Sequence, residues 1–237
     1  MALEGRVALI TGGAGHLGSA VTKRLLADGA RVVACERSQE RLDALTEELG
    51  APEALSTIAC DVLVEDEVRR MMARVHEEQD GPDALLNIVG GFAGGTTVAE
   101  TELALWERMM ALNLTSVFLC AKHALPLMLD AGFGRIVSVS SKAAEDLPAK
   151  RAAYAVSKGG VLSLTACMAK EVAGTGVACA AILPSIIDTP ATREARPKAD
   201  PSRWVTPEQI ADVIAWLISE DAGAINGSVL RLYGELI

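Results

Sequence analysis

The sequence predicts an α/β fold with one doubly wound parallel sheet of about seven strands and helices on both faces. Three observations support this prediction. Short apolar runs of strand length alternate with amphipathic helical stretches, as in parallel strands joined by helical crossovers. The 237 residues, 50% of them apolar, suit one large core better than two smaller ones. No internal repeat, low-complexity tract or linker interrupts the chain, so we expect a single domain over residues 1–237.

The first half of the chain shows the alternation most clearly. Apolar positions between the strand-like runs recur every three or four residues, which is the period of a helix face. A flexible glycine-rich loop, Gly90–Gly95, closes this half at the end of a strand. The strands expected here are Val7–Ile10, Val32–Cys35, Ser56–Asp61 and Ala84–Val89, and the helices are about Leu17–Leu26, Gln39–Leu49 and Glu65–Gln79.

The second half begins with a long helix, from about Glu102 toward Leu129. Residues 189–205 are polar and contain prolines, so we expect a loop or lid that closes over a substrate. The other expected elements are strands Arg135–Ser140, Val177–Leu183 and Ser228–Tyr233, and helices Tyr154–Ala173 and Pro207–Ile218.

The charge and the apolar pattern exclude some classes of partner. The net charge is −9 with no basic cluster, which argues against a nucleic-acid surface. The chain enters an apolar strand within a few residues of Met1, so we expect no targeting leader and a cytoplasmic protein. Polar residues such as Asn113 and Lys122 interrupt the longest apolar region, about Ala111–Leu129, so we expect a core or interface helix there rather than a membrane span.

A glycine-rich turn follows the first strand. From Thr11 to Gly18 the residues are Thr-Gly-Gly-Ala-Gly-His-Leu-Gly, with glycines at every third position from Gly12. Gly12 can form the tight turn, Gly15 lets the backbone approach a pyrophosphate, and Gly18 allows the helix to pack closely on the strand. A plain surface loop is the alternative. The strand, turn and helix together favour a dinucleotide site that includes Thr11, His16 and Leu17.

The second strand ends in an acidic residue that bears on which coenzyme binds. Glu36 lies eighteen residues after Gly18, where a carboxylate can accept hydrogen bonds from the ribose hydroxyls of NAD and repels the 2′-phosphate of NADP. An ordinary solvated carboxylate is the alternative. The sequence therefore favours NAD(H), while Arg37 beside Glu36 keeps NADP(H) open.

Tyr154 and Lys158 are candidate catalytic residues. Four residues apart on a helix, they share one face, and a nearby lysine charge favours the phenolate and lowers the pKa of a tyrosine. Ser141 ends an apolar run thirteen residues earlier. A serine at a strand end often bonds only to backbone, but its spacing from Tyr154 favours a role in the same site. The three histidines, His16, His76 and His123, have no metal-ligand spacing, so we expect no metal.

With these residues in place, the chain resembles the short-chain dehydrogenase/reductase family over essentially its whole length. The resemblance implies a Rossmann-type NAD(P)-binding domain, a small-molecule substrate and a Ser141, Tyr154 and Lys158 mechanism that Asn113 assists by helping to relay protons. It also implies that Lys158 and Tyr154 contact the coenzyme. Departures are His16 in the turn, Ser185 in place of a glycine, and Asn87-Ile-Val-Gly90 in place of Asn-Asn-Ala-Gly. The further coenzyme contacts that the resemblance implies are Asp61, Val62, Asn87, Gly90, Pro184, Ile187 and Thr189.

Two segments are similar to the dihydropteridine reductase group. They are Val89–Gly95 and the run from Leu183 to Trp204. That group reduces a quinonoid dihydropterin with NADH and lacks both the serine and the helix asparagine, so Ser141 and Asn113 favour ordinary carbonyl chemistry. The pterin reaction stays open as an alternative. A protein that binds NAD as a signal without turnover is a second alternative, although it would not need Ser141, Tyr154 and Lys158 together.

The helix that begins at Tyr154 is apolar nearly all round, as in a helix that is buried on two sides. One side can face the sheet. The other, with the apolar half of the Glu102 helix, can face a partner subunit. We therefore expect a homo-oligomer, a dimer or a tetramer, as is common in the family that the chain resembles.

Overall fold

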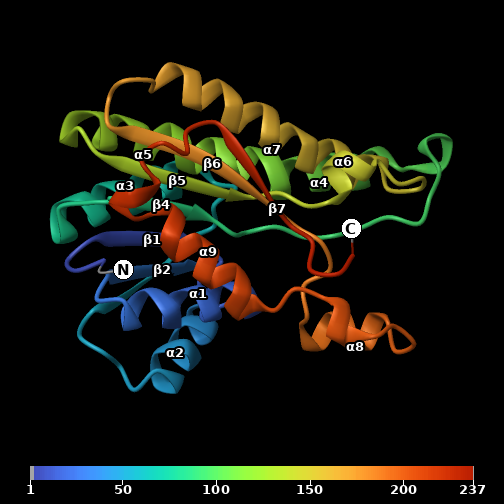
Figure 1. Ribbon diagram of the computed structural model, residues 1–237, viewed down its shortest axis with the longest axis horizontal. Coiled ribbons are helices and arrows are strands. Elements are labelled where there is room, and N and C mark those ends of the chain that lie inside the picture. Colours follow the sequence, from blue (N-terminus) through green and yellow to red (C-terminus); the bar gives the residue numbers. More distant parts are fainter. Residues whose placement is uncertain (1–2, 237) are drawn as a thin grey trace.

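Seven parallel strands form one twisted sheet in the computed structural model, which describes residues 3–236 (Figure 1). The strand order is β3-β2-β1-β4-β5-β6-β7, so the direction of winding reverses between β1 and β4. The predicted doubly wound parallel sheet is confirmed. The strands are β1 Val7–Thr11, β2 Arg31–Glu36, β3 Leu55–Ala59, β4 Ala84–Asn87, β5 Gly134–Val139, β6 Val177–Pro184 and β7 Ser228–Leu232.

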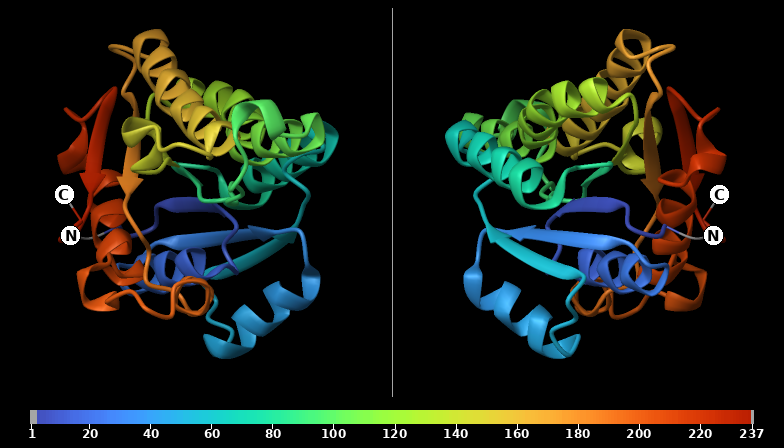
Figure 2. Two further views of the ribbon diagram at one scale, coloured as in Figure 1. Left: turned by 90° about the vertical axis from the view of Figure 1, so that its right-hand side faces the viewer. Right: turned by 90° about the vertical axis from the view of Figure 1, so that its left-hand side faces the viewer.

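Helices cover both faces of the sheet, as the two side views show (Figure 2). Successive side chains of a strand point to opposite faces, and β1 is apolar at every position before Thr11, so both of its faces need cover. Val7 and Leu9 belong to one core cluster, Ala8 and Ile10 to the other. One face carries α1 His16–Ala27, α2 Gln39–Glu48 and α9 Pro207–Leu217, and the other carries α3 Glu65–Gln79, α4 Leu103–Met110, α5 Ser116–Ala131 and α7 Ala152–Glu171.

The predicted helix from Glu102 is continuous over Leu103–Ala131 but contains one irregular turn. Ala111–Thr115 forms a π-helical turn between α4 and α5, and it holds the predicted site residue Asn113. By length and composition this helix could cross a bilayer. However, 44% of its most apolar stretch is buried against the rest of the chain, as in the core helix of a globular domain.

Two short helices were not predicted. The expected loop at 189–205 contains α8, Pro190–Ala195, and a 3₁₀ turn, Pro201–Arg203. The hydroxyl of Thr189 accepts a hydrogen bond from the backbone N–H of Thr192 at 3.2 Å, and a proline follows in the first helical position. These are ordinary helix-start signals. The second unpredicted helix is α6, Ala143–Asp146, directly after β5.

β3 and β4 each end two residues earlier than the sequence suggested. β3 ends at Ala59 rather than Asp61, because Asp61 starts a turn in which its side chain accepts from Leu63 N at 3.0 Å. β4 ends at Asn87 rather than Val89, because the backbone N–H of Ile88 bonds to the hydroxyl of Thr11 at 3.2 Å instead of continuing the ladder. In both cases a side chain takes over a backbone bond.

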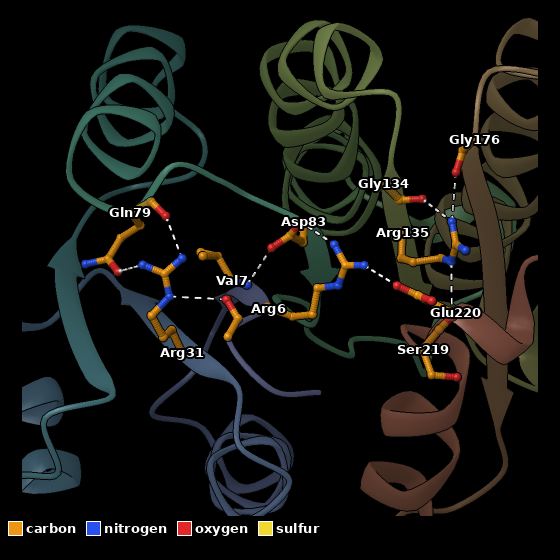
Figure 3. Close-up of polar contacts among 11 residues, drawn as sticks. Arg6, Val7, Arg31, Gln79, Asp83, Gly134, Arg135, Gly176, Ser219 and Glu220 are labelled. Carbon is orange, nitrogen blue, oxygen red and sulfur yellow. Dashed lines mark hydrogen bonds and ion pairs between the residues drawn. The ribbon is translucent and has the colours of Figure 1, made fainter. Parts of the chain in front are cut away.

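At the amino edge of the sheet, where the strands begin, charged side chains bond to one another (Figure 3). One oxygen of Asp83 accepts from Arg6 Nη1 at 3.2 Å, and the other accepts from the Val7 backbone N–H at 2.8 Å. Arg6 also pairs with Glu220. These bonds tie the starts of β1 and β4 to the turn after α9.

Arg135 lies in the same network and is only 6% exposed. Its guanidinium donates to the carbonyl oxygens of Gly134 and Gly176, each at 2.9 Å, and to that of Ser219 at 3.3 Å. Arg135 also stacks on the ring of Phe133, with 4.4 Å between the guanidinium carbon and the ring centroid. The buried charge is therefore well supplied with hydrogen-bond acceptors.

Candidate active site

The turn after β1 brings the N-terminus of α1 to the carboxyl edge of the sheet, where the strands end. Gly12 has a φ of +72°, the left-handed region that favours glycine. A Cβ on Gly18 would lie 2.0 Å from the Gly12 carbonyl oxygen, so no side chain fits there. The N-cap residue of α1 is Gly15, so no cap side chain bonds to the first N–H groups of the helix, and the first turn of α1 holds no acidic residue. The free N–H groups and the positive helix end suit an anion such as a diphosphate.

The other predicted residues of this turn differ in what they do. The hydroxyl of Thr11 donates to Leu86 O at 3.2 Å and accepts from Ile88 N at the same distance, so it joins β1 to the end of β4. His16 is the first residue of α1. Leu17 lines the cavity described below. Thr11 therefore fixes the end of β1 against the end of β4, whereas Leu17 lines the cavity.

Glu36 ends β2 beside this turn. One of its oxygens accepts from the Arg37 backbone N–H at 3.0 Å, and the other lies 3.4 Å from Nη1 of Arg41. Arg41 also donates to the carbonyl oxygen of Ala14 in the glycine-rich turn, at 3.0 Å. The Arg37 side chain points into solvent. Sequence reasoning missed Arg41, which links the Glu36 carboxylate to the turn.

Asp61 and Val62 follow β3, next to the end of β2. The two strands pair as far as Glu36 with Ala59, so Asp61 lies close to the Glu36 end. The Asp61 backbone N–H donates to a carboxylate oxygen of Glu67 at 2.8 Å. Val62 is only 5% exposed and packs in the core. The Asp61 backbone is thus held at the carboxyl edge by Glu67, and the neighbouring Val62 is anchored in the core.

Asn87 and Gly90 lie at the end of β4. The Asn87 side chain donates to the hydroxyl of Ser138 on β5 at 3.2 Å, while its Oδ1 is buried without a partner in the described residues. A Cβ on Gly90 would lie 3.0 Å from both Asn113 Oδ1 and Lys158 Nζ. A side chain at position 90 would therefore press on two polar side chains that meet against that backbone.

Ser141 and Tyr154 meet across the site. The Ser141 hydroxyl accepts from the Ala143 backbone N–H at 3.2 Å, and both Ser141 and Tyr154 line the cavity described below. Burial raises the pKa of Tyr154, and the nearby Ser141 hydroxyl and the charge of Arg151 oppose that rise. The expectation that Lys158 lowers this pKa is wrong for this structure, because burial dominates.

Lys158 is buried one turn further along α7. Its Nζ donates to the carbonyl oxygen of Val139 at 2.8 Å, and burial lowers its pKa to about 8. The Asn113 amide accepts from Gly91 N at 2.9 Å and donates to the hydroxyl of Ser157 at 3.0 Å. The amide of Asn113 is thus bonded within the protein, and it holds the loop after β4 against α7.

Phe92 and Arg151 flank the phenol, and sequence reasoning singled out neither. The Phe92 ring stands edge-on to the Tyr154 ring, with 5.0 Å between centroids. The Arg151 guanidinium lies over the other ring, 5.3 Å from the Phe92 centroid. The loop that carries Phe92 is held to the segment just before α7 by a bond from Gly95 N to Lys150 O at 2.7 Å. In the sequence, Arg151 was marked only by its position three residues before Tyr154.

A cavity of about 870 Å³ lies over these residues. It runs from Leu17 at the start of α1 to Ser141, Tyr154 and Lys158, and Pro184, the last residue of β6, also lines it. No group of three His, Cys, Asp or Glu side chains within residues 3–236 could hold a metal ion. The predicted residues that line the cavity are Leu17, Gly90, Ser141, Tyr154, Lys158, Pro184, Ile187 and Thr189.

Comparison with known proteins agrees with this arrangement. The family model described as short chain dehydrogenase matches residues 6–200. The chain belongs to the short-chain dehydrogenase/reductase family. It is 32% identical to the 3-oxoacyl-[acyl-carrier-protein] reductase FabG of Thermotoga maritima, with all of both chains covered. It is 33% identical to the 2-(R)-hydroxypropyl-CoM dehydrogenase of Xanthobacter autotrophicus, with 97% of each covered.

Solved structures of this family share the fold closely. An actinorhodin polyketide ketoreductase with NADPH has a TM-score of 0.91 and 30% identity, and the match covers 100% of this chain and 99% of that one. Family membership makes this chain an NAD(P)-binding oxidoreductase of small molecules. The likeness of two segments to dihydropteridine reductase gains no support from these relatives, which are named for oxo and hydroxy compounds.

Proposed function

We propose that this short-chain dehydrogenase/reductase transfers hydride between NAD(P)(H) and a carbonyl or alcohol substrate, with Ser141, Tyr154 and Lys158 as catalytic residues. The observation that carries the proposal is that Ser141, Tyr154 and Lys158 line one cavity at the carboxyl edge of the sheet. A hydroxyl, a phenol and an ammonium around one cavity can hold and protonate one substrate oxygen.

The reduction direction shows what each residue does. Tyr154 donates its proton to the substrate oxygen, and Ser141 hydrogen-bonds that same oxygen while negative charge develops on it. Because burial raises the pKa of Tyr154, the phenol is protonated at neutral pH and can act as the acid. Lys158, one turn further along the same helix, lines the same cavity and would hold the nicotinamide ribose of the bound coenzyme. Asn113 is a positioning residue, since it holds the loop that faces Lys158.

The residues present fit a nicotinamide coenzyme. Gly12, Gly15 and the N-terminus of α1 would hold the diphosphate, and Glu36 would meet the adenosine ribose. Lys158 and Tyr154 would meet the nicotinamide end, where the bound coenzyme supplies or takes the hydride.

Coenzyme choice is a further part of the proposal. Glu36 favours NAD(H), and its pairing with Arg41 at 3.4 Å fixes the carboxylate beside the turn. Titration of NADH and NADPH by tryptophan fluorescence tests this preference. Tighter NADH binding is expected, and Glu36→Gln should narrow the difference. Equal affinities in the wild-type protein would mean that Arg37 or Arg41 binds a 2′-phosphate as readily.

The substrate class is tested with a panel of carbonyl compounds. The purified protein with NADH or NADPH is offered simple ketones, short 3-oxoacyl thioesters, quinones and quinonoid dihydropterin. Reduction of ketones or oxoacyl thioesters supports the proposal. Activity with the dihydropterin alone would favour the pterin reaction, and coenzyme binding without turnover of any compound would favour an NAD-binding sensor.

Assembly into a homo-oligomer is also proposed. Phe118 on α5 and Val156 on α7 are each 46% exposed, and Trp106 on α4 is 36% exposed. All three helices cover the same face of the sheet, so a second copy packed there would bury these side chains. Light scattering at micromolar concentration should give a dimer or a tetramer. A monomer would contradict the proposal, and so would a Phe118→Asp variant with unchanged mass.

A further inference from the structure

The charges around the cavity are unbalanced. Five of its lining residues are charged, and they are four cations and one anion: Lys142, Asp146, Arg151, Lys158 and Arg196. The chain as a whole is acidic, with 31 Asp and Glu against 22 Lys and Arg. A cationic cavity in an acidic protein points to a ligand that brings negative charge of its own.

Two of the four cations are already satisfied. The Lys142 ammonium bonds to both oxygens of Asp146, at 2.7 and 2.9 Å. The Lys158 ammonium bonds to Val139 O and serves the catalytic site. Arg151 and Arg196 remain, and within residues 3–236 neither guanidinium has a carboxylate within 4.0 Å or a side-chain hydrogen bond.

Arg151 is held close to the reacting centre. It precedes the first turn of α7 and is half-buried. A Cβ on Gly94 would lie 3.1 Å from its Cγ, so the stem of the side chain packs against the loop after β4. Its guanidinium rests on Phe92, which itself contacts Tyr154. An anion bound at Arg151 would therefore lie about one aromatic ring away from the phenol.

Arg196 comes from the other side of the cavity. It ends α8, and α8 and the start of α7 flank the carboxyl edge of the sheet (Figure 1). The neighbouring Arg193 is engaged, because it forms two bonds to Asp188 at 2.6 and 2.8 Å. That pair and the Thr189 cap fix α8, while Arg196 lines the cavity without a protein partner.

The geometry points to a substrate whose carbonyl or alcohol carbon is joined, through a short apolar body, to a terminal carboxylate or sulfonate that Arg151 and Arg196 bind. This inference rests on the proposed carbonyl chemistry and adds the substrate class. Guanidinium groups bind such planar or trigonal oxyanions with paired hydrogen bonds. The apolar part of the wall can take the body of the substrate, and it includes Phe92, Pro148, Ile186 and Leu236.

Matched pairs of probes test the inference. For the carboxylate, 4-oxocyclohexanecarboxylate is compared with its uncharged amide. For the sulfonate, 2-(2-oxopropylthio)ethanesulfonate is compared with 1-(ethylthio)propan-2-one. A charge-assisted bond contributes about 1.5–3 kcal/mol, so kcat/KM with coenzyme in excess should favour at least one anion over its neutral partner by about tenfold or more. The pair with the larger ratio identifies the anion.

Substitutions then assign the effect. Arg151→Gln and Arg196→Gln should each lower kcat/KM for the favoured anion about tenfold, mainly through KM, and leave the neutral partner within about twofold. Arg151→Lys should restore part of the loss. Lys198→Gln is the matched control, because Lys198 is an exposed cation of the same segment that does not line the cavity. Activity on the neutral partner shows that each variant is folded.

A binding measurement separates failure of this inference from failure of the proposed chemistry. Cyclohexanecarboxylate and its amide are titrated calorimetrically into the protein with coenzyme present. The acid should bind the wild-type protein more tightly than the amide, and Arg151→Gln should remove that difference. Equal binding of the two, or a ratio that neither arginine changes, overturns the inference whether or not any ketone is reduced. A variant that weakens only coenzyme binding overturns it too, because the arginines would then serve the coenzyme phosphates.

Discussion

At the amino edge of the sheet Arg135 gives its guanidinium protons to three backbone carbonyls, whereas at the carboxyl edge the Arg151 guanidinium has no hydrogen bond or ion pair within the described residues. The same contrast holds for side-chain acceptor oxygens. Asp83 accepts two bonds at the amino edge, and Asn87 Oδ1 at the carboxyl edge is buried without a donor. One edge satisfies its polar groups within the protein, and the other has groups still available for ligands.

This difference follows from the topology of parallel sheets. All strand ends meet at one edge, and the winding reverses between β1 and β4, which opens a crevice there. At the opposite edge the charged side chains bond to one another (Figure 3). Changes at the carboxyl edge should therefore reduce activity with little loss of stability, and changes at the amino edge should do the reverse.

The largest effect is expected for Tyr154→Phe. Removing the proton donor should lower kcat for any carbonyl substrate by about 10²- to 10⁴-fold, the range for a positioned general acid. The phenylalanine ring keeps the contact with Phe92, so the melting temperature should change little. Steady-state kinetics and thermal unfolding on one preparation check both parts. A variant that keeps most of its activity would remove Tyr154 from the mechanism.

Ser141→Ala should have the next largest effect. Loss of one donor to a developing oxyanion lowers turnover by about 10²- to 10³-fold. Coenzyme affinity should stay unchanged, because the Ser141 hydroxyl bonds to Ala143 N and not to the turn after β1. Ser140→Ala is a matched control for a hydroxyl that bonds to Lys158 O inside the protein at 2.8 Å. A loss below about tenfold for Ser141→Ala would favour the pterin reaction, which proceeds without that hydroxyl.

Arg135→Met tests the amino edge. The change leaves the carbonyls of Gly134, Gly176 and Ser219 without their donor. Each unsatisfied buried group costs about 1–3 kcal/mol. We expect a net loss of about 2–4 kcal/mol in unfolding free energy. Urea unfolding measures it. Arg31→Met, which removes the more exposed bond to Gln79 O at 2.9 Å, should lose less.

Activity completes that test. The Arg135→Met protein, assayed well below its melting temperature, should keep kcat/KM within about twofold, because Arg135 lies at the edge opposite Tyr154. A large drop in kcat with unchanged stability would show that the two edges are not independent.

The sequence predicted the sheet and the catalytic set better than it predicted the surroundings of the site. Seven apolar runs marked the seven strands, because each crosses a core covered on both faces. Ser141, Tyr154 and Lys158 could be found from spacing, because the strand end and the helix that carry them are close in the chain. The roles of these residues and the coenzyme preference stay predictions, and so do the oligomeric state and the cytoplasmic location.

What could not be predicted depends on contacts between distant segments. Arg41 reaches Ala14 and Glu36 from helix α2, and nothing in its neighbourhood of the sequence marks it. Phe92 contacts Tyr154 across sixty-two residues of chain. The prediction of a lowered pKa for Tyr154 was wrong for a related reason. Lys158, four residues away in the sequence, suggested a lowered value, whereas burial of the phenol by the whole fold raises it.

The smallest expected effect concerns stability at the carboxyl edge and comes from Lys158. Burial lowers the pKa of its ammonium to about 8, against about 10.4 in an unfolded chain. Between these two pH values the unfolded chain binds more protons than the folded one, so this group makes the folded state more stable as pH rises through the window. Below about pH 8 the buried charge is present in full, and it destabilises the fold.

Lys158→Met removes that charge and sharpens the contrast with Arg135, whose buried charge is matched by acceptors. At pH 7 the variant should be as stable as the wild-type protein or more stable, even though the bond to Val139 O is lost. Its advantage should shrink as pH rises from about 8 to 10.5, because the wild-type lysine then loses its proton in the folded state. Urea unfolding of both proteins at several pH values gives the difference, from which groups that titrate alike in both cancel. Lys198→Met, an exposed control, should show no such trend. A difference for Lys158→Met that stays constant with pH would mean that the ammonium titrates normally, and the carboxyl edge would then carry no stability cost from this charge.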